Sequence, residues 1–157
     1  MSQTAAALST DAVTEIAEAL NQCVAETVVT TMLAQNFHWN VKGMAFGPLH
    51  ALFQEIYEDH FVAQDDLAER VRQIGAHAEG KLAGMLERSK VAERDGHEKA
   101  EEMIALLADA QRTVAASLAG CADVAEKHGD LLTQDLCISR GQTHEKFAWL
   151  LSAHLEG

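Results

Sequence analysis

The chain has 157 residues, of which 12 are Lys or Arg and 24 are Asp or Glu, so its formal charge is −12. This length suits one compact domain, residues 1–157, and a hydrophobic content of 48% excludes wholesale disorder. A single proline and 5% aromatic residues argue against an all-β fold, and the acidic excess argues against nucleic acid as the default partner.

Apolar residues recur at three- and four-residue steps in four long stretches, which is the period of an amphipathic helix. The first long helix is predicted from about 10 to 38, with Thr10 or Asp11 capping its start. Residues 1–9 contain no Lys or Arg and are predicted to form a short, non-basic N-terminal tail. Without a basic segment there, no secretory signal is expected.

The second long helix is predicted to reach about Gly75, with Pro48 in its first turn, where a helix tolerates proline. Glycines interrupt the pattern over 76–95. Leu82 and Met85 nevertheless allow a short extra helix in this middle connection.

The third long helix is predicted to follow a cap at 95–98 and to run to about 127. His128 and Gly129 indicate its end, and the fourth helix follows. The pattern predicts an all-α fold, a four-helix bundle with a short extra helix in the middle connection. The longest uncharged run has 15 residues and is polar, so no membrane span is expected.

The three cysteines are odd in number and form no C-x-x-C pair. We interpret them as reduced thiols on helix faces of a cytoplasmic protein. A metal or redox role is the alternative. The cysteines are Cys23, Cys121 and Cys137.

Eight histidines in an acidic helical chain suggest a metal site. The usual iron site inside a four-helix bundle uses Glu-x-x-His pairs, since a three-residue step puts both side chains on one face. No Asp or Glu stands three residues before any histidine. The usual intra-bundle di-iron site and a haem-holding ferritin relative are therefore not expected.

A different set of ligands is present. His38 would end the first helix and His50 would begin the second, so a helical hairpin would bring them together. Asp65 and Glu69 are four residues apart and share one helix face. His50 and Asp65 are separated by about 22 Å along one helix, so one chain cannot close a site. Two chains with antiparallel second helices would close two equal sites, which would suit iron, manganese or zinc.

The alternative is an ordinary charged surface. Glu69 would then pair with Arg72, and Asp66 with Arg70, as exposed ion pairs that contribute little stability. On this interpretation the protein is a helical scaffold without a metal.

Three segments resemble the Dps family of mini-ferritins. They are residues 36–43, which read NFHWNVKG, the pair Leu49-His50, and residues 65–71, which read DDLAERV. Residues 145–151 also look like the final helix of that family, and the similarity covers nearly the whole chain.

The resemblance implies a hollow homo-dodecamer of four-helix bundles that oxidises Fe(II), preferably with hydrogen peroxide, and stores the ferric mineral without haem. Its ferroxidase centres would take His38 and His50 from one chain and Asp65 and Glu69 from the other. Trp39 would lie beside the centre, either as a packing residue or as a shield that intercepts radicals. Consuming both Fenton reactants would protect the cell from oxidative damage.

Gln54 departs from the family pattern, because members often carry an acid four residues after the second histidine. An amide is neutral and a weaker iron ligand, which puts a second iron position in doubt.

The resemblance does not decide whether the protein binds DNA. Relatives that bind DNA directly often use basic tails, and this chain has none, so direct DNA binding is not expected. The competing function is a nucleoid-binding architectural protein with little ferroxidase activity.

Acidic pores would admit iron. Their predicted residues are Glu126, Asp130 and Asp135, with helix capping by Asp130 as the alternative.

Overall fold

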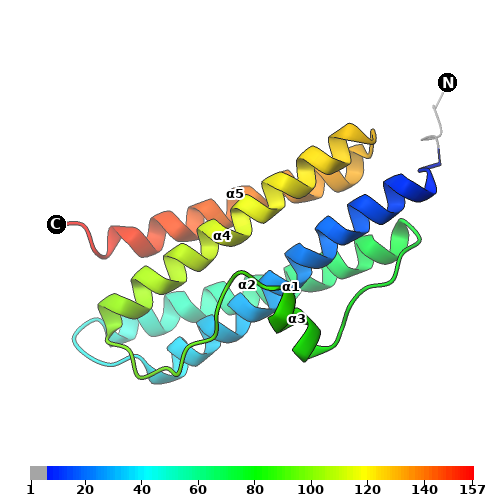
Figure 1. Cartoon of the computed structure of the whole chain (residues 1–157). Helices are drawn as coiled ribbons and strands as arrows, with labels where there is room; N and C mark the ends of the chain where they lie inside the picture. Colours follow the sequence, from blue (N-terminus) through cyan, green and yellow to red (C-terminus); the bar gives the residue numbers. More distant parts are fainter. Residues whose placement is uncertain (1–6) are drawn as a thin grey trace.

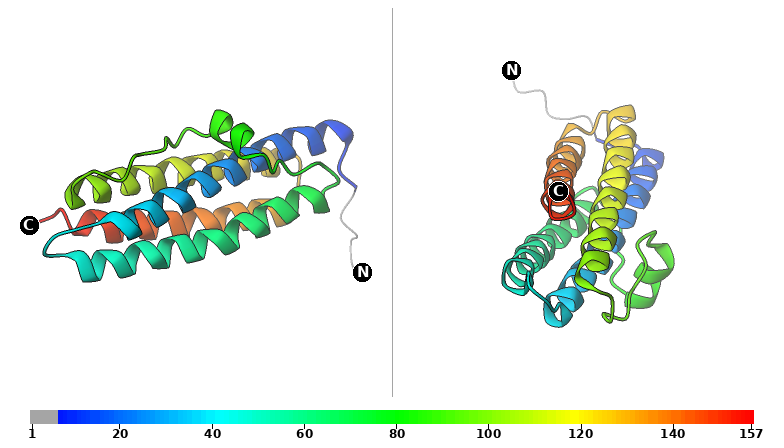
Figure 2. Two further views of the ribbon diagram at one scale, coloured as in Figure 1. Left: turned by 90° about the horizontal axis from the view of Figure 1, so that it is seen from below. Right: turned by 90° about the vertical axis from the view of Figure 1, so that its left-hand side faces the viewer.

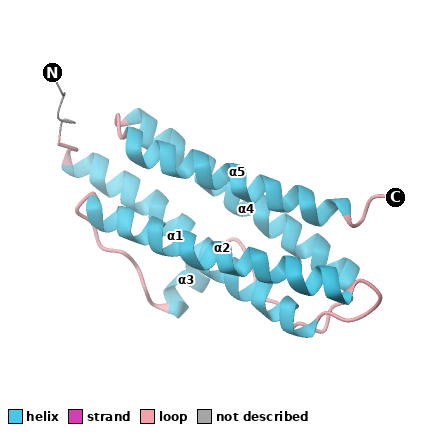
Figure 3. Ribbon diagram, turned by 180° about the vertical axis from the view of Figure 1, so that it is seen from behind, coloured by secondary structure: helices cyan, strands magenta, loops and turns pink. Residues whose placement is uncertain are grey.

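Residues 7–157, which the computed structural model describes, form five α-helices and no strand (Figures 1 and 3). The helices are α1 (Thr10–Asn40), α2 (Phe46–Gln73), α3 (Leu82–Arg88), α4 (Ala100–Lys127) and α5 (Leu131–Ala153). The predicted fold class is confirmed, with four long helices and a short one in the middle connection. Of the predicted tail at 1–9, residues 1–6 lie outside the described part.

The long helices are arranged as two antiparallel hairpins, α1 with α2 and α4 with α5 (Figure 1). Helix α1 also packs on α4, which joins the hairpins into a four-helix bundle. Helix α3 packs on α1 outside the bundle, as the end-on view in Figure 2 shows. The long connection from α2 to α4 runs back along the bundle, so the α1–α2 turn lies at the end where α4 begins (Figure 1).

The helix starts differ from the predicted caps by a few residues. Ser9, rather than Thr10 or Asp11, caps α1, since its hydroxyl accepts the backbone N–H of Ala12. Helix α4 begins at Ala100 and not after a cap at 95–98. Gly96 has φ of +87° there, a left-handed conformation that interrupts a helix.

The bundle core is apolar along most of its length. Its largest fully buried side chains include Phe37, Phe53, Ile16, Leu20 and Leu49. None of the helices between residues 7 and 157 combines the length and the apolarity needed to cross a lipid bilayer.

A cluster of polar side chains lies within this core between α2, α4 and α5. The fully buried side chains of His60 and His144 each place a ring nitrogen near the Gln111 amide oxygen, at 3.0 and 2.7 Å. His60 Nδ1 lies 2.9 Å from Asp59, which also accepts from Arg140 at 2.7 Å. Burial lowers the pKa of both histidines, so both imidazoles are neutral near pH 7.

Candidate metal centre

The turn between α1 and α2 brings His38 and His50 into contact. His38 lies in the last turn of α1 and is buried, whereas His50 lies in the first turns of α2 and is partly exposed. Gly43 makes the reversal with φ of +107°, in the left-handed region that glycine adopts most readily. The two rings stack with centroids 3.7 Å apart and planes 15° apart. The predicted meeting of these two helix ends is therefore observed.

Each imidazole is oriented by the other residue's backbone. Nδ1 of His38 lies 2.7 Å from the carbonyl oxygen of His50, and Nδ1 of His50 lies 2.7 Å from the carbonyl oxygen of His38. A carbonyl oxygen only accepts, so both Nδ1 atoms carry the hydrogen. In the neutral rings both Nε2 atoms therefore keep a lone pair. A histidine that binds a metal is commonly oriented in this way through its other ring nitrogen.

Two more aromatic rings contact this pair, and neither was predicted from the sequence. The ring of Phe46 stacks on His50 with centroids 4.9 Å apart. The ring of Tyr57 meets His38 edge-on at 5.2 Å. Tyr57 follows His50 by two helical turns on the same face of α2, and that spacing was the available signal.

Asp65 and Glu69 lie together on the C-terminal half of α2, away from His50, and both are exposed. The ion pairs that would make them ordinary surface charges do not form within residues 7–157. Arg70 pairs with Asp130 at 2.9 Å, and Arg72 donates to a backbone carbonyl. Both carboxylates are thus available to bind a cation.

The four predicted ligands form two separate pairs in one chain. Within the part of the chain described, no three His, Cys, Asp or Glu side chains converge as a metal site. His50 and Asp65 remain on one continuous helix, about 22 Å apart.

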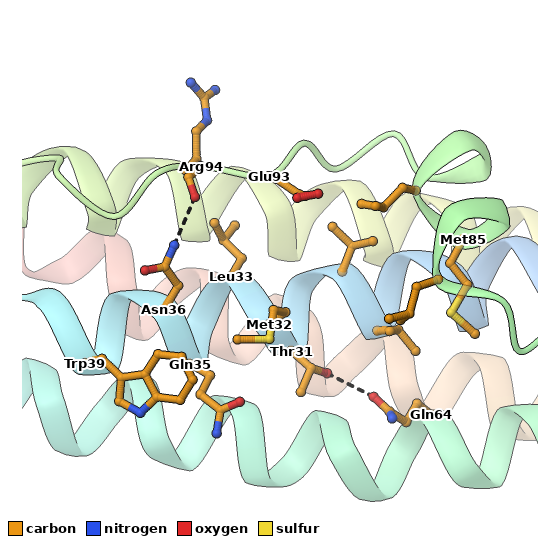
Figure 4. Close-up of a pocket in the computed structure, with 14 residues that line it drawn as sticks. Thr31, Met32, Leu33, Gln35, Asn36, Trp39, Gln64, Met85, Glu93 and Arg94 are labelled. Carbon is orange, nitrogen blue, oxygen red and sulfur yellow. Dashed lines mark hydrogen bonds between the residues drawn. The ribbon is translucent and has the colours of Figure 1, made fainter.

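Trp39 and Gln54 flank the histidine pair without contacting its rings through an aromatic contact or a hydrogen bond among the described residues. Trp39 is 60% exposed and lines a groove between α1 and α3 together with Gln35 (Figure 4). Gln54 donates its amide N–H to Glu58 at 2.8 Å.

The three predicted pore residues differ in exposure. Asp130 is buried and caps α5, because its carboxylate accepts from Thr133 and from Arg70. The capping alternative therefore describes Asp130. Glu126 and Asp135 are exposed near the turn between α4 and α5.

The cysteines approach one another inside the bundle. All three are free and buried. Contact between neighbouring thiols and burial raise the pKa of Cys137, so this thiol remains protonated.

Comparison with known proteins places this geometry in a family. The model of the ferritin-like domain matches residues 17–157. The DNA protection during starvation protein of Brevibacillus brevis is 37% identical over 141 residues, covering 90% of this chain and 95% of that protein.

Solved structures agree with this assignment. The Dps structure from Bacillus brevis superposes with a TM-score of 0.91 at 36% identity, covering 95% of this chain and all of that one. Dps from Vibrio cholerae, described as a member of the ferritin-like diiron-carboxylate proteins, has a TM-score of 0.90 at 28% identity and covers 98% of this chain and 100% of its own. This chain belongs to the Dps family of ferritin-like proteins.

Proposed function

We propose that this protein oxidises Fe(II), with hydrogen peroxide as the preferred oxidant, at centres shared between two subunits and stores the Fe(III) formed. Each centre takes His38 and His50 from one subunit and Asp65 and Glu69 from its mate. The observation that carries the proposal is the reciprocal Nδ1–H bonding of the two stacked imidazoles, which leaves both Nε2 atoms free for a cation.

The ligand types suit iron oxidation. Imidazoles and carboxylates both bind Fe(II), and hard anionic oxygen ligands stabilise Fe(III) more strongly than Fe(II). Oxidation at the centre is therefore favoured. It removes Fe(II) and peroxide together, and these are the two reactants that generate hydroxyl radical.

An antiparallel pairing of two α2 helices supplies the missing half of each centre. His50 and Asp65 then meet across a two-fold axis that passes near Glu58, halfway between them. Phe61 and Val62 lie within a turn of that point and are 66% and 60% exposed in the single chain. These apolar side chains are suited to burial against a second copy.

Twelve subunits form a hollow cytoplasmic shell that holds the ferric mineral, and Fe(II) enters through acidic openings that include Glu126 and Asp135. The negative charge of the chain, −12, favours accumulation of cations at such openings.

Replacing one carboxylate tests the assignment. Glu69→Ala removes a charged ligand, so Fe(II) oxidation by peroxide is expected to slow at least about tenfold while the assembly remains intact. Asp66→Ala is the matched control, because Asp66 is an exposed carboxylate on α2 that lies about 100° around the helix from Asp65. The rate is followed by absorbance of the ferric product and assembly by size-exclusion chromatography. An unchanged rate for Glu69→Ala contradicts the site assignment.

Mixed assemblies test whether the centre is shared. One variant carries His38→Ala and His50→Ala, and the other carries Asp65→Asn and Glu69→Ala. A mixed dimer has one complete centre, so co-assembly of two inactive variants in equal amounts is expected to recover about a quarter of the wild-type rate. No recovery in verified mixed assemblies contradicts a shared centre.

A further inference from the structure

We propose that Tyr57 supplies the second electron when peroxide reacts at a centre holding one Fe(II), because its ring lies against the iron ligand His38. This inference rests on the proposed function and extends it to a redox-active protein residue.

Contact and composition single out Tyr57. Its ring and that of His38 form a T-shaped contact with centroids 5.2 Å apart, so the phenol ring lies directly against a proposed iron ligand. Tyr57 is the sole tyrosine among the 157 residues. The ring on the other side of the stack, Phe46, is not readily oxidised.

The ligands of the centre determine how many iron ions it holds when peroxide arrives. Two imidazoles and two carboxylates satisfy a single iron, with room for peroxide. The next side chain along the same face, Gln54, is neutral, and its amide is bonded to Glu58. A second iron is therefore held weakly, and peroxide often meets a single Fe(II).

Peroxide accepts two electrons, whereas Fe(II) releases one. With Fe(II) alone, cleavage of the O–O bond yields hydroxide and a hydroxyl radical. With Tyr57, the phenol gives up one electron and its proton in the same event: Fe(II) + H2O2 + TyrOH → Fe(III) + OH⁻ + H2O + TyrO•. A later Fe(II) restores the phenol: TyrO• + Fe(II) + H⁺ → TyrOH + Fe(III). Together the two steps consume one peroxide and two Fe(II), with no hydroxyl radical released.

Trp39 is the other oxidisable ring next to a ligand, but its position differs. Its indole is exposed and lines the groove with Gln35 rather than contacting either imidazole within the described chain (Figure 4). Trp39→Phe therefore serves as the matched control for Tyr57→Phe, a change that keeps the ring in contact with His38 and removes only the phenol oxygen.

The experiment loads the assembled protein with one Fe(II) per centre, adds peroxide, and freezes samples at early times for electron paramagnetic resonance. Wild type and Trp39→Phe are expected to show a tyrosyl signal, and Tyr57→Phe none. A spin trap in parallel samples is expected to report several-fold more hydroxyl radical from Tyr57→Phe than from wild type or Trp39→Phe.

The outcomes separate the two proposals. If wild type oxidises Fe(II) without a tyrosyl signal, or if Tyr57→Phe releases no more hydroxyl radical than wild type, the role of Tyr57 is refuted and the proposed function stands. If wild type does not oxidise Fe(II) at all, both fail.

Discussion

Four of the eight histidines of this chain form two contrasting pairs. His38 and His50 are oriented by backbone carbonyls and keep one nitrogen each for a ligand. His60 and His144 are enclosed in the core, where their ring nitrogens face Asp59, Gln111 and Arg140. The two pairs therefore differ in whether a ring nitrogen is left for a ligand.

The buried pair predicts that acid destabilises the protein. Burial lowers the pKa of His60 below the ordinary 6.5 and that of His144 to about 2. Burial opposes ionisation of Asp59, but hydrogen bonds from His60 and Arg140 outweigh it, and the pKa of this carboxyl is well below its usual range. Between the folded and unfolded pKa values only the unfolded state binds the protons, so the stabilisation is complete above pH 6.5 and declines as the pH falls.

Denaturant unfolding at a series of pH values checks this. The free energy of unfolding is expected to decrease below pH 6.5 by up to about 1.4 kcal/mol per pH unit for each buried imidazole. Replacing His60 and His144 by Gln reduces the slope, whereas His154→Gln leaves it unchanged, since His154 is exposed. A profile that is flat, or that rises toward acid, contradicts the neutral state of the pair.

Part of the site was predictable from residue spacing. His38 and His50 flank a short connection between two helical patterns, so their meeting follows from a hairpin. The ring contact of Tyr57 and the direction of each Nδ1 were not predictable, because they depend on rotamers and on the geometry of the turn. The completion of the centre by a second chain stays a prediction.

At the scale of elements, the connection from α2 to α4 is held by side chains of α1. Asn21 accepts the backbone N–H of Glu79, Gln22 donates to a carbonyl at the end of α3, and Asn36 donates to the carbonyl of Arg94 (Figure 4). Buried Glu26 accepts the backbone N–H of Lys90. Polar side chains along one helix thus supply the hydrogen bonds that a segment without regular structure lacks.

Among the glycines of this segment, Gly96 lies closest to a neighbouring helix. Its φ is +87°, and a Cβ atom there would lie 2.2 Å from Oδ1 of Asn36 and 3.0 Å from Nδ2 of Asn40. Gly96→Ala is expected to lower the free energy of unfolding by about 2–4 kcal/mol through backbone strain and displacement of Asn36.

Gly75→Ala separates these two causes. Gly75 has a similar φ of +96° and nothing within 4 Å of the added atom, so only the backbone strain, about 1–2 kcal/mol, is expected. Both variants are compared by urea unfolding. Equal losses would show that the contact with Asn36 contributes nothing.

The four long helices were predictable from the sequence, whereas the end of this segment, where α4 begins, was not. The apolar period predicted all four long helices because each buries one continuous face, and α3 followed from a short apolar cluster. The start of α4 was predicted too early, because the acidic residues near 95–98 resemble a cap. Gly96 instead has a positive φ and lies close to Asn36 of α1, a long-range approach that no local pattern contains.

At the scale of the whole molecule, charge governs which partners approach. In the proposed shell, twelve copies at −12 each would carry −144 in total, before any iron is counted. Such a shell would concentrate cations near its surface and repel polyanions at distances within the screening length of the buffer.

The acidic charge of the chain predicts that the protein does not bind duplex DNA directly. A gel shift with duplex DNA at near-neutral pH and moderate salt, without free iron, is expected to show no retarded band, because counterion release requires Lys and Arg side chains on the phosphates. A matched positive control adds a Lys-rich extension before residue 1, which is expected to produce retardation that weakens steeply with salt. A clear retarded band from the unmodified protein contradicts the prediction and favours the architectural alternative. If that band vanishes when a chelator is added, divalent cations bridge the two polyanions instead.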